Sequence, residues 1–324
     1  MEDLCSVLFE LSNQDRLRIL HQLDKGAMNV TNLARELGLT VQECSRHVSR
    51  LDDVGLTEKD VEGLLHVSPY GRLVLKQLLG LKFTSRYRDY FATHSLAHLP
   101  RESVLRIGDL AASSYVGDIS AAFHSVDKMI QEAEEYVWSI TDQHLVSTYP
   151  LLRDALERGV KVKEIEAKGW VVHPKLTQEW YAKDAMRQDF LRARTTGLLE
   201  ERMLERLDVY LYMSEKDVAA VAFTLPDGGF DYLGFTATDQ RSHKWCRDLF
   251  QHYWDKARNR ARVVEELYNW IKKRPEAIGV LMNIAEGEMA VGREELVSEL
   301  EKTSLIKRGK LTVLGQFVCA KFRQ

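Results

Sequence analysis

The chain of 324 residues lacks the features that mark several classes of protein. Its four cysteines never occur in the Cys-x-x-Cys spacing of metal knuckles and dithiol redox sites. No apolar run approaches the length of a membrane span, and the N-terminus lacks the basic start and apolar core of a secretory signal. We therefore expect a cytoplasmic protein with no membrane segment, no metal site and no cofactor.

The composition leaves room for several folded domains. Proline is scarce, at 6 residues, while 45% of the chain is hydrophobic and 29% is charged, as in ordinary globular proteins. A chain of this length can bury two or three separate cores. The cysteines each lie in an apolar helical pattern, which predicts buried structural thiols at Cys5, Cys44, Cys246 and Cys319.

The first part of the chain is predicted to be helical, with short breaks. Residues 13–23 repeat apolar side chains at helical spacing, and Val30–Leu37 places its apolar residues on one face before a stop at Gly38. Thr40-Val-Gln-Glu43 has the form of a capping box, so a further helix begins there. The expected buried face of this helix comprises Val41, Cys44, Val48 and Leu51.

Two short strand-like pieces follow at 56–60 and 64–68, with a turn at Gly63 between them. From Tyr70 the pattern returns to helix as far as Tyr90. Three helices followed by a two-stranded wing is the layout of a winged helix-turn-helix domain. We place this domain at residues 1–80 and a linker helix at 81–102.

The helix that begins at Thr40 offers a polar side to solvent. Side chains of these types bond base edges in a major groove, since arginine matches guanine, glutamine matches adenine, and serine reaches bases or phosphates. The pattern therefore predicts a face that reads double-stranded DNA. The candidate residues are Thr40, Gln42, Ser45, Arg46, His47, Ser49 and Arg50.

The charge balance of this domain is weak for a DNA-binding protein. Residues 1–90 hold 12 Lys and Arg against 13 Asp and Glu, and the wing at 58–63 is acidic. Since phosphate contacts supply most non-specific affinity, we expect one domain to bind modestly and a homodimer to be needed. The candidate phosphate contacts are Arg16, Arg18 and Arg35.

Residues 103–260 alternate between helical and strand-like segments, which predicts an α/β layer structure. The expected helices are 119–135, 149–158, 177–192 and 238–260. The expected strands are 136–140, 160–165, 207–213, 218–223 and 230–235. The last two strands are expected to form a hairpin, because residues 225–229 have turn chemistry.

The tail, residues 261–324, is expected to be a small helical unit. Residues 304–318 repeat an order found in the first domain, with an apolar pair, a turn at Gly309, and Leu314-Gly315 where the first domain has Tyr70-Gly71. We therefore predict a second, reduced winged-helix-like unit that lacks one helix.

The segment 12–20 resembles the start of ArsR-like winged-helix regulators. Residues 130–142, 214–216, 227–232 and 245–250 resemble the middle domain of archaeal regulators typified by the methanogen filamentation regulators. This resemblance covers nearly the whole chain and implies an archaeal source and a dimeric transcription factor. The chain departs from the arsenic-sensing branch because it has no Cys-x-Cys metal box.

Such middle domains resemble the phospholipase D fold, whose signature is His-x-Lys-x-x-x-x-Asp. His173-Pro-Lys175 matches the first half of that signature, but Trp180 stands where the aspartate belongs. The motifs of phosphate-binding loops, zinc peptidases and serine hydrolases are absent from the sequence as well. We therefore expect no enzymatic activity.

Effector binding is expected at the carboxyl ends of the strands, where open α/β sheets bind small molecules. Two of these ends are polar, and two arginines near the end of the 177–192 helix suit an anionic group. The candidate effector residues are Asp142, Gln143, Lys168, Arg192 and Arg194.

The sequence thus predicts a multidomain α+β or α/β chain. A winged helix-turn-helix precedes a central α/β, phospholipase-D-like domain at 103–260 and a small winged-helix-like unit at 261–324. The predicted function is a homodimeric, DNA-binding transcription regulator that senses a small-molecule effector. Two alternatives remain open: a protein-interaction scaffold that uses its winged helices, favoured by the acidic wing, and a degenerate phospholipase-D-like hydrolase.

Overall fold

The computed structural model describes residues 1–142, 148–169, 171, 184–287 and 293–322. These residues divide into two compact units, Met1–Arg86 and Tyr87–Gln324. We call them the N-terminal unit and the large unit. Within the described ranges, no helix has both the length and the apolar character needed to cross a membrane.

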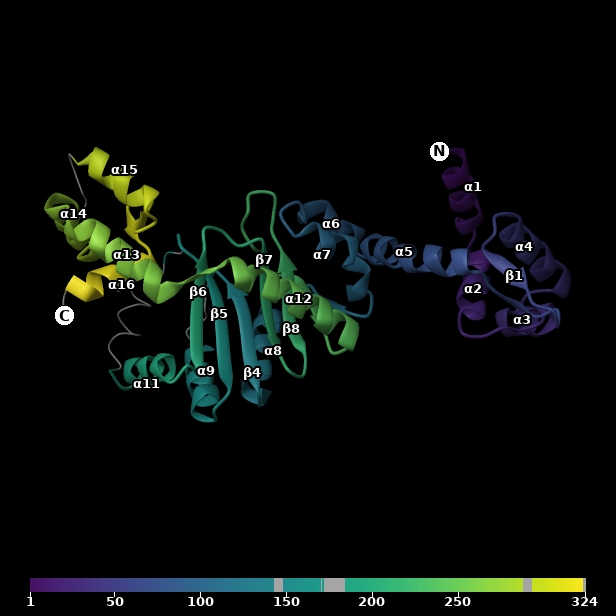
Figure 1. Cartoon of the computed structure of the whole chain (residues 1–324), viewed down its shortest axis with the longest axis horizontal. Coiled ribbons are helices and arrows are strands. Elements are labelled where there is room, and N and C mark those ends of the chain that lie inside the picture. The colour runs from purple at the N-terminus through teal and green to yellow at the C-terminus, as the bar shows by residue number, and fades with distance from the viewer. Residues whose placement is uncertain (143–147, 170, 172–183, 288–292, 323–324) are drawn as a thin grey trace. The chain divides into compact units, whose positions relative to one another are not determined.

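The N-terminal unit is a helical bundle with a two-stranded wing (Figure 1). Its core forms where the apolar faces of three helices meet, and Ile19, Leu20, Leu33 and Leu51 are completely buried there. The elements are α1 (Glu2–Leu11), α2 (Gln14–Leu23), α3 (Val30–Leu37), α4 (Val41–Asp53), β1 (Thr57–Lys59), β2 (Leu65–Val67) and α5 (Pro69–Arg86).

Local chemistry sets the ends of these helices. The side chain of Asn29 accepts a hydrogen bond from the backbone N–H of Asn32 at the start of α3. Gly38 ends α3 with a φ of 68°, a left-handed conformation that glycine adopts without steric cost. Thr40 and Glu43 form the capping box at the start of α4. The structure therefore confirms the helix-turn-helix pattern read from the sequence.

Three details of this unit differ from the prediction. Val41 is 47% exposed because it lies in the first turn of α4, outside the row of core residues. Cys5 is exposed on α1, whereas the other three cysteines are buried. The long helix α5 ends at Arg86, and the rest of the expected helix falls in the large unit, where α6 (Arg88–Thr93) is a separate short helix.

The large unit contains an eight-stranded mixed sheet in the order β10-β6-β5-β4-β7-β8-β9-β3. The strands β4, β5 and β6 run parallel, and the other neighbours are antiparallel. The strands are β3 (Ser114–Val116), β4 (Tyr136–Thr141), β5 (Lys161–Ala167), β6 (Leu199–Leu204), β7 (Val209–Ser214), β8 (Val218–Phe223), β9 (Gly234–Ala237) and β10 (Arg258–Asn259).

Helices cover both faces of this sheet, as Figure 1 shows. The core on one face joins three helices to the central strands, and α12 packs on the opposite face through its aromatic residues. Because β7 and β8 lie under cover on both sides, every residue of both strands is buried. The helices are α7 (Arg101–Leu105), η1 (Ile107–Leu110), α8 (Ile119–Glu132), α9 (Thr148–Glu157), α11 (Asp184–Thr195) and α12 (Gln240–Lys256).

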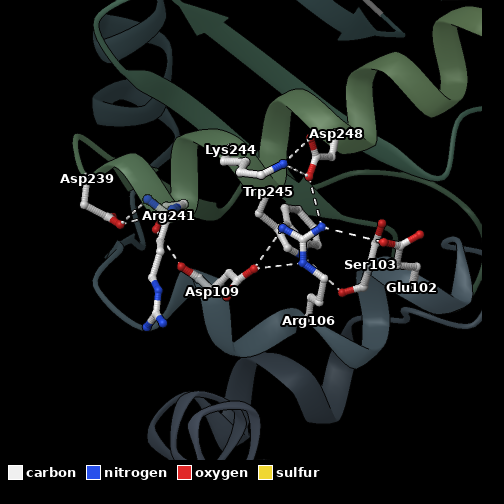
Figure 2. Close-up of polar contacts among 10 residues, drawn as sticks. Glu102, Ser103, Arg106, Asp109, Asp239, Arg241, Lys244, Trp245 and Asp248 are labelled. Carbon is white, nitrogen blue, oxygen red and sulfur yellow. Dashed lines mark hydrogen bonds and ion pairs between the residues drawn. The ribbon is translucent and has the colours of Figure 1, made fainter. Parts of the chain in front are cut away.

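A network of polar contacts fixes α7 and η1 to α12 (Figure 2). The Arg106 guanidinium lies 2.9 Å from Asp248 on α12 and 3.0 Å from Asp109. The indole N–H of Trp245 donates to the carbonyl of Ser103 at 3.0 Å. These contacts hold α7 and η1 against α12, the helix that covers one face of the sheet.

The sequence did not predict β6, β3 or β10. Half of the residues of β6, Leu-Glu-Glu-Arg-Met-Leu, are charged, and charged residues are weak strand formers. The predicted strand 230–235 begins only at Gly234, because Tyr232 has a left-handed φ of 63° that interrupts extended backbone. The predicted helix 238–260 ends at Lys256, where Ala257 turns to an extended conformation.

The last part of the large unit, Arg260–Phe322, has its own core, and we call it the C-terminal region. Three helices precede its hairpin, so the prediction of a missing helix is wrong. The elements are α13 (Arg260–Lys272), α14 (Pro275–Ala285), α15 (Glu294–Lys302), β11 (Ile306–Lys307), β12 (Lys310–Leu311) and α16 (Val313–Phe322).

A buried ion cluster joins the C-terminal region to the sheet. Arg260, the first residue of α13, lies 3.1 Å from Glu166 on β5 and also pairs with Glu201 on β6. All three side chains are less than one-tenth exposed. Burial alone would lower the pKa of Arg260. The nearby carboxylates of Glu201 and Glu166 have the larger effect and raise this pKa above its ordinary value, so the guanidinium stays charged.

Candidate nucleic-acid interface

The helix α4 has one buried side and one exposed side. Cys44 and Leu51 are completely buried and Val48 is 6% exposed, so these three fix α4 on the core. At its start, the backbone N–H of Glu43 donates to Thr40 Oγ1 at 3.2 Å, and the N–H of Thr40 donates to Glu43 Oε2 at 3.0 Å. Hydrogen bonds from Thr40 hold the pKa of Glu43 below its ordinary value.

The structure brings the predicted DNA-reading residues together on the exposed side of α4. His47 is half-buried at the edge of this face, and the other six side chains are exposed. We call five of them the exposed face of α4, because they follow the helical repeat opposite the core residues. They are Gln42, Ser45, Arg46, Ser49 and Arg50.

Sequence reasoning missed a partner of this face, the carboxylate of Glu10. Arg50 Nη1 donates to Glu10 Oε1 at 3.2 Å, although the Arg50 side chain remains 52% exposed. Glu10 itself is buried on α1 and lies 3.1 Å from the Nε of Arg16. The carboxylate therefore restrains the Arg50 guanidinium at the edge of α4.

A pocket of about 450 Å³ lies beside the exposed face. The first residues of α2 and the end of α1 form one wall, and the basic side of α4 forms the other. Its lining residues are Phe9, Ser12, Asn13, Arg16, Arg46, His47 and Arg50. The guanidinium groups of Arg46 and Arg50 beside the N-terminus of α2 make this a favourable place for an anion such as a backbone phosphate.

The three arginines predicted to contact phosphates differ in their burial and in their hydrogen-bond partners. Arg16 is buried, and its guanidinium donates to the carbonyl oxygens of Glu10 and Phe9, so the prediction of a DNA contact there is wrong. Arg18 donates to Asp15 and to the carbonyl of Leu37. Arg35 is exposed and bonds the side chain of Asn32.

The wing of the N-terminal unit is acidic, as predicted. Asp60 shapes its turn by accepting hydrogen bonds from the backbone N–H groups of Glu62 and Leu64 at 2.9 and 2.8 Å. Glu58 lies 3.5 Å from His66 across the strand pair. Val61 stands fully exposed at the tip. This wing therefore repels phosphates, whereas the exposed face of α4 carries two arginines and no acidic residue.

Three of the predicted effector residues within the described ranges bind three different partners. Asp142 accepts a hydrogen bond from Tyr232 at 3.1 Å, and Arg194 pairs with Glu201 at 2.6 Å. Lys168 pairs with Glu205, and Arg192 is exposed on α11. Gln143 lies outside the described residues, as do His173, Lys175 and Trp180 of the incomplete phospholipase D signature.

A larger pocket, about 620 Å³, lies elsewhere in the large unit. It is bounded by the segment before α7, the turn between β6 and β7, and the last turns of α12. His252 lines it, and burial followed by the charge of Lys256 lowers the pKa of that imidazole. No group of histidine, cysteine, aspartate or glutamate in the described ranges is arranged to hold a metal ion.

Comparison with known protein families finds a match within the N-terminal unit. Residues 11–60, which include α2, α3, α4 and β1, match the family described as a helix-turn-helix domain. The N-terminal unit is therefore a helix-turn-helix domain, here with a wing, and the large unit is a mixed α/β sheet domain. No curated protein matches the chain.

Solved structures give only distant likenesses. The archaeal chromatin protein TrmBL2 is 15% identical over 76% of this chain and 94% of its own, with a TM-score of 0.36. An ArsR-like transcriptional regulator from Rhodococcus sp. RHA1 is 22% identical over 28% of this chain and 88% of its own, with a TM-score of 0.22. The O-methyltransferase NcsB1 is 12% identical over 61% of this chain and 64% of its own, with a TM-score of 0.21. These scores are too low to carry an argument about function.

Proposed function

We propose that this protein is a DNA-binding transcription regulator that reads duplex DNA with α4. The observation that carries the proposal is the division of α4, which buries Cys44, Val48 and Leu51 while a row of base-bonding side chains stays exposed. A helix anchored in this way within a helix-turn-helix domain has the shape and the donors to lie in a major groove.

Arg46 is the residue of this face best placed to contact a base. It is exposed, it lies one turn before Arg50, and it has no ion-pair partner in the described part of the chain. Its five N–H donors are therefore free to bond the two acceptors of a guanine. Arg50 contributes the same chemistry with a guanidinium that Glu10 restrains.

The test is a series of mobility shifts on genomic fragments, with thermal unfolding to check the fold. Arg46→Ala is expected to lower the affinity for the preferred fragment by about 5- to 150-fold, the loss of one bidentate base contact. Arg50→Lys, which keeps a charge beside Glu10, is expected to lower it in the same direction. Arg72→Ala, an exposed arginine on α5, is the matched control and is expected to bind like the parent.

Equal binding by the parent, Arg46→Ala and Arg50→Lys would overturn this assignment of α4. The acidic wing supports a second candidate, a scaffold that binds other proteins through its helix-turn-helix domain. Salt separates the two, because DNA affinity falls steeply as the salt concentration rises. A binding constant that is indifferent to salt would favour the scaffold.

We propose further that the protein acts as a homodimer and that the large unit binds a small effector without catalysing a reaction. The dimer is supported by apolar side chains that α1 leaves in solvent, among them Leu4 and Phe9. The effector proposal is supported by the pocket beside α12, whose volume suits a small molecule. Native mass spectrometry of the purified chain tests it, by detecting a compound that copurifies and is released on unfolding.

A further inference from the structure

The C-terminal region repeats the wing of the N-terminal unit in atomic detail. In the N-terminal unit, Ser68 Oγ donates to the carbonyl of Gly55 and accepts from the backbone N–H of Gly71 at 2.8 Å. In the C-terminal region, Thr312 Oγ1 donates to the carbonyl of Ser304 and accepts from the N–H of Gly315 at 3.0 Å. The same hydroxyl clasp therefore closes both hairpins.

The backbone around the two clasps matches as well. Gly55 and Ser304 both have a left-handed φ, of 74° and 61°. A methyl group added to Gly71 would overlap the carbonyl oxygen of Leu56, and one added to Gly315 would overlap that of Leu305. Gly71 thus lets α5 pack directly against the backbone of Leu56, and Gly315 lets α16 pack in the same way against the backbone of Leu305. The C-terminal region is a second winged helix with a shorter wing.

The two winged helices carry opposite charges at equivalent places. The second helix of the N-terminal pair, α4, is basic on its exposed face, and the wing that follows is acidic. In the C-terminal region the corresponding helix α15 is acidic, with Glu294 and Glu295 in its first turn, and the wing is basic. We call residues Lys307–Lys310 the C-terminal wing.

The charges of the C-terminal wing are crowded together, and the carboxylate at its turn, Glu301, accepts from the backbone N–H of Gly309 at 3.4 Å and pairs with none of the three cations. Lys307 lies directly opposite Lys310 across the strand pair, an arrangement of like charges that destabilises a hairpin. Arg308 stands between them with a left-handed φ of 48°, a conformation that arginine adopts only at a steric cost. All three are exposed, and none forms an ion pair within the described residues. A bound polyanion would relieve this repulsion.

We propose that the C-terminal wing binds the phosphate backbone of duplex DNA and adds a contact that carries no sequence information. The tip, Arg308-Gly309, forms a two-residue turn in which both residues have positive φ, and the Arg308 side chain is exposed there. The acidic helix α15 is repelled by phosphates and does not enter a groove. The choice of duplex DNA as the polyanion rests on the proposed function of α4.

The test measures affinity against salt concentration by fluorescence anisotropy, using the full chain and a mixed-sequence duplex three helical turns long. The triple variant Lys307→Gln/Arg308→Gln/Lys310→Gln is compared with Lys128→Gln/Lys161→Gln/Arg241→Gln, which removes the same charge from exposed sites on α8, β5 and α12. The wing variant is expected to reduce the slope of log affinity against log salt by about 2 to 3, since each phosphate contact contributes about 0.9.

A single variant separates this effect from misfolding. Arg308→Gly removes the charge and relieves the left-handed arginine, so the melting temperature is expected to stay the same or rise while the slope falls by about 1. If the wing triple changes the slope no more than the control triple, the inference is overturned. If it leaves DNA binding intact but weakens binding to vesicles of anionic lipid, the polyanion is a membrane and the inference is overturned.

Failure of the proposed function has a different signature. In the Arg46→Ala/Arg50→Ala background, discrimination between fragments is expected to disappear while salt-dependent binding that requires the C-terminal wing persists. If the α4 variants discriminate between DNA fragments as the parent does, the role assigned to α4 is wrong. The role of the C-terminal wing is then still tested separately, by the slope of log affinity against log salt in the wing variants.

Discussion

Single hydroxyl groups hold both hairpins of this chain closed. Ser68 and Thr312 each bridge a carbonyl two residues before a hairpin to the first turn of the helix after it. The buried backbone N–H groups of Gly71 and Gly315 would otherwise lack these partners, and an unsatisfied buried group costs about 1–3 kcal/mol. The glycine three residues later is required by the same geometry, because any side chain there would meet a backbone carbonyl.

We predict that Gly71→Ala and Gly315→Ala each lower the free energy of unfolding by about 1–3 kcal/mol, the usual cost of forcing a methyl group into a packed site. Gly26→Ala is the matched control, since nothing lies within 4 Å of its added methyl and its φ is ordinary. Urea unfolding followed by circular dichroism measures the change. If both variants were as stable as Gly26→Ala, the close crossings at Leu56 and Leu305 would be refuted.

At the scale of helices and strands, the sequence predicted best where local chemistry decides. The capping box at Thr40 and the stop at Gly38 are properties of a few neighbouring residues, and the structure confirms both. The polar face of α4 was predictable for the same reason, since helical spacing alone separates it from the core. The strand β6 was not, because its Glu201 is stabilised by Arg260 from a distant helix.

The same reasoning explains what the sequence missed at the candidate site. Glu10 lies forty residues before Arg50, and only the packing of α1 beside α4 brings the two together. Arg16 looked like a surface cation, but its position places the guanidinium against the end of α1. A single sequence carries no signal for such pairings between elements.

The helix α1 allows a prediction about association. Leu4 and Leu8 are 54% and 45% exposed one turn apart on α1, beside Phe9 at 63%. We predict that Leu4→Glu/Leu8→Glu shifts the chain from dimer to monomer, because carboxylates cannot be buried between two copies of this helix. Analytical ultracentrifugation measures the state.

Asp3→Asn/Glu2→Gln changes the charge of the same helix by two units in the opposite direction, leaves its apolar residues in place and is expected to leave the dimer intact. A parent chain that sediments as a monomer at all concentrations tested would refute the dimer. A glutamate variant that remains dimeric would move the interface away from α1.

At the scale of the whole molecule, the buried cation Arg260 joins two parts of the large unit. Arg260 joins two strands of the sheet to the first helix of the C-terminal region, and its guanidinium also lies 4.4 Å from the ring of Phe317. The C-terminal region and the sheet are thereby coupled through Glu166 and Glu201, whose charges are buried.

We predict that Arg260→Ala lowers the free energy of unfolding of the large unit by about 3–5 kcal/mol, since it leaves two buried carboxylates without their counter-ion. Arg262→Ala, an exposed arginine of the same helix, is expected to change it by less than about 0.5 kcal/mol. Differential scanning calorimetry distinguishes the two. Equal melting profiles would show that Glu166 and Glu201 do not need Arg260.

The order of strands in the sheet also affects whether the sheet can pair edge to edge with the sheets of other molecules. Both outermost strands, β10 and β3, are very short, with two and three residues. Short edge strands offer few free backbone groups to a strand of another molecule, and they cover the outer sides of β6 and β9. Loss of Ser114–Val116 would uncover β9 and turn a self-contained sheet into a template for aggregation.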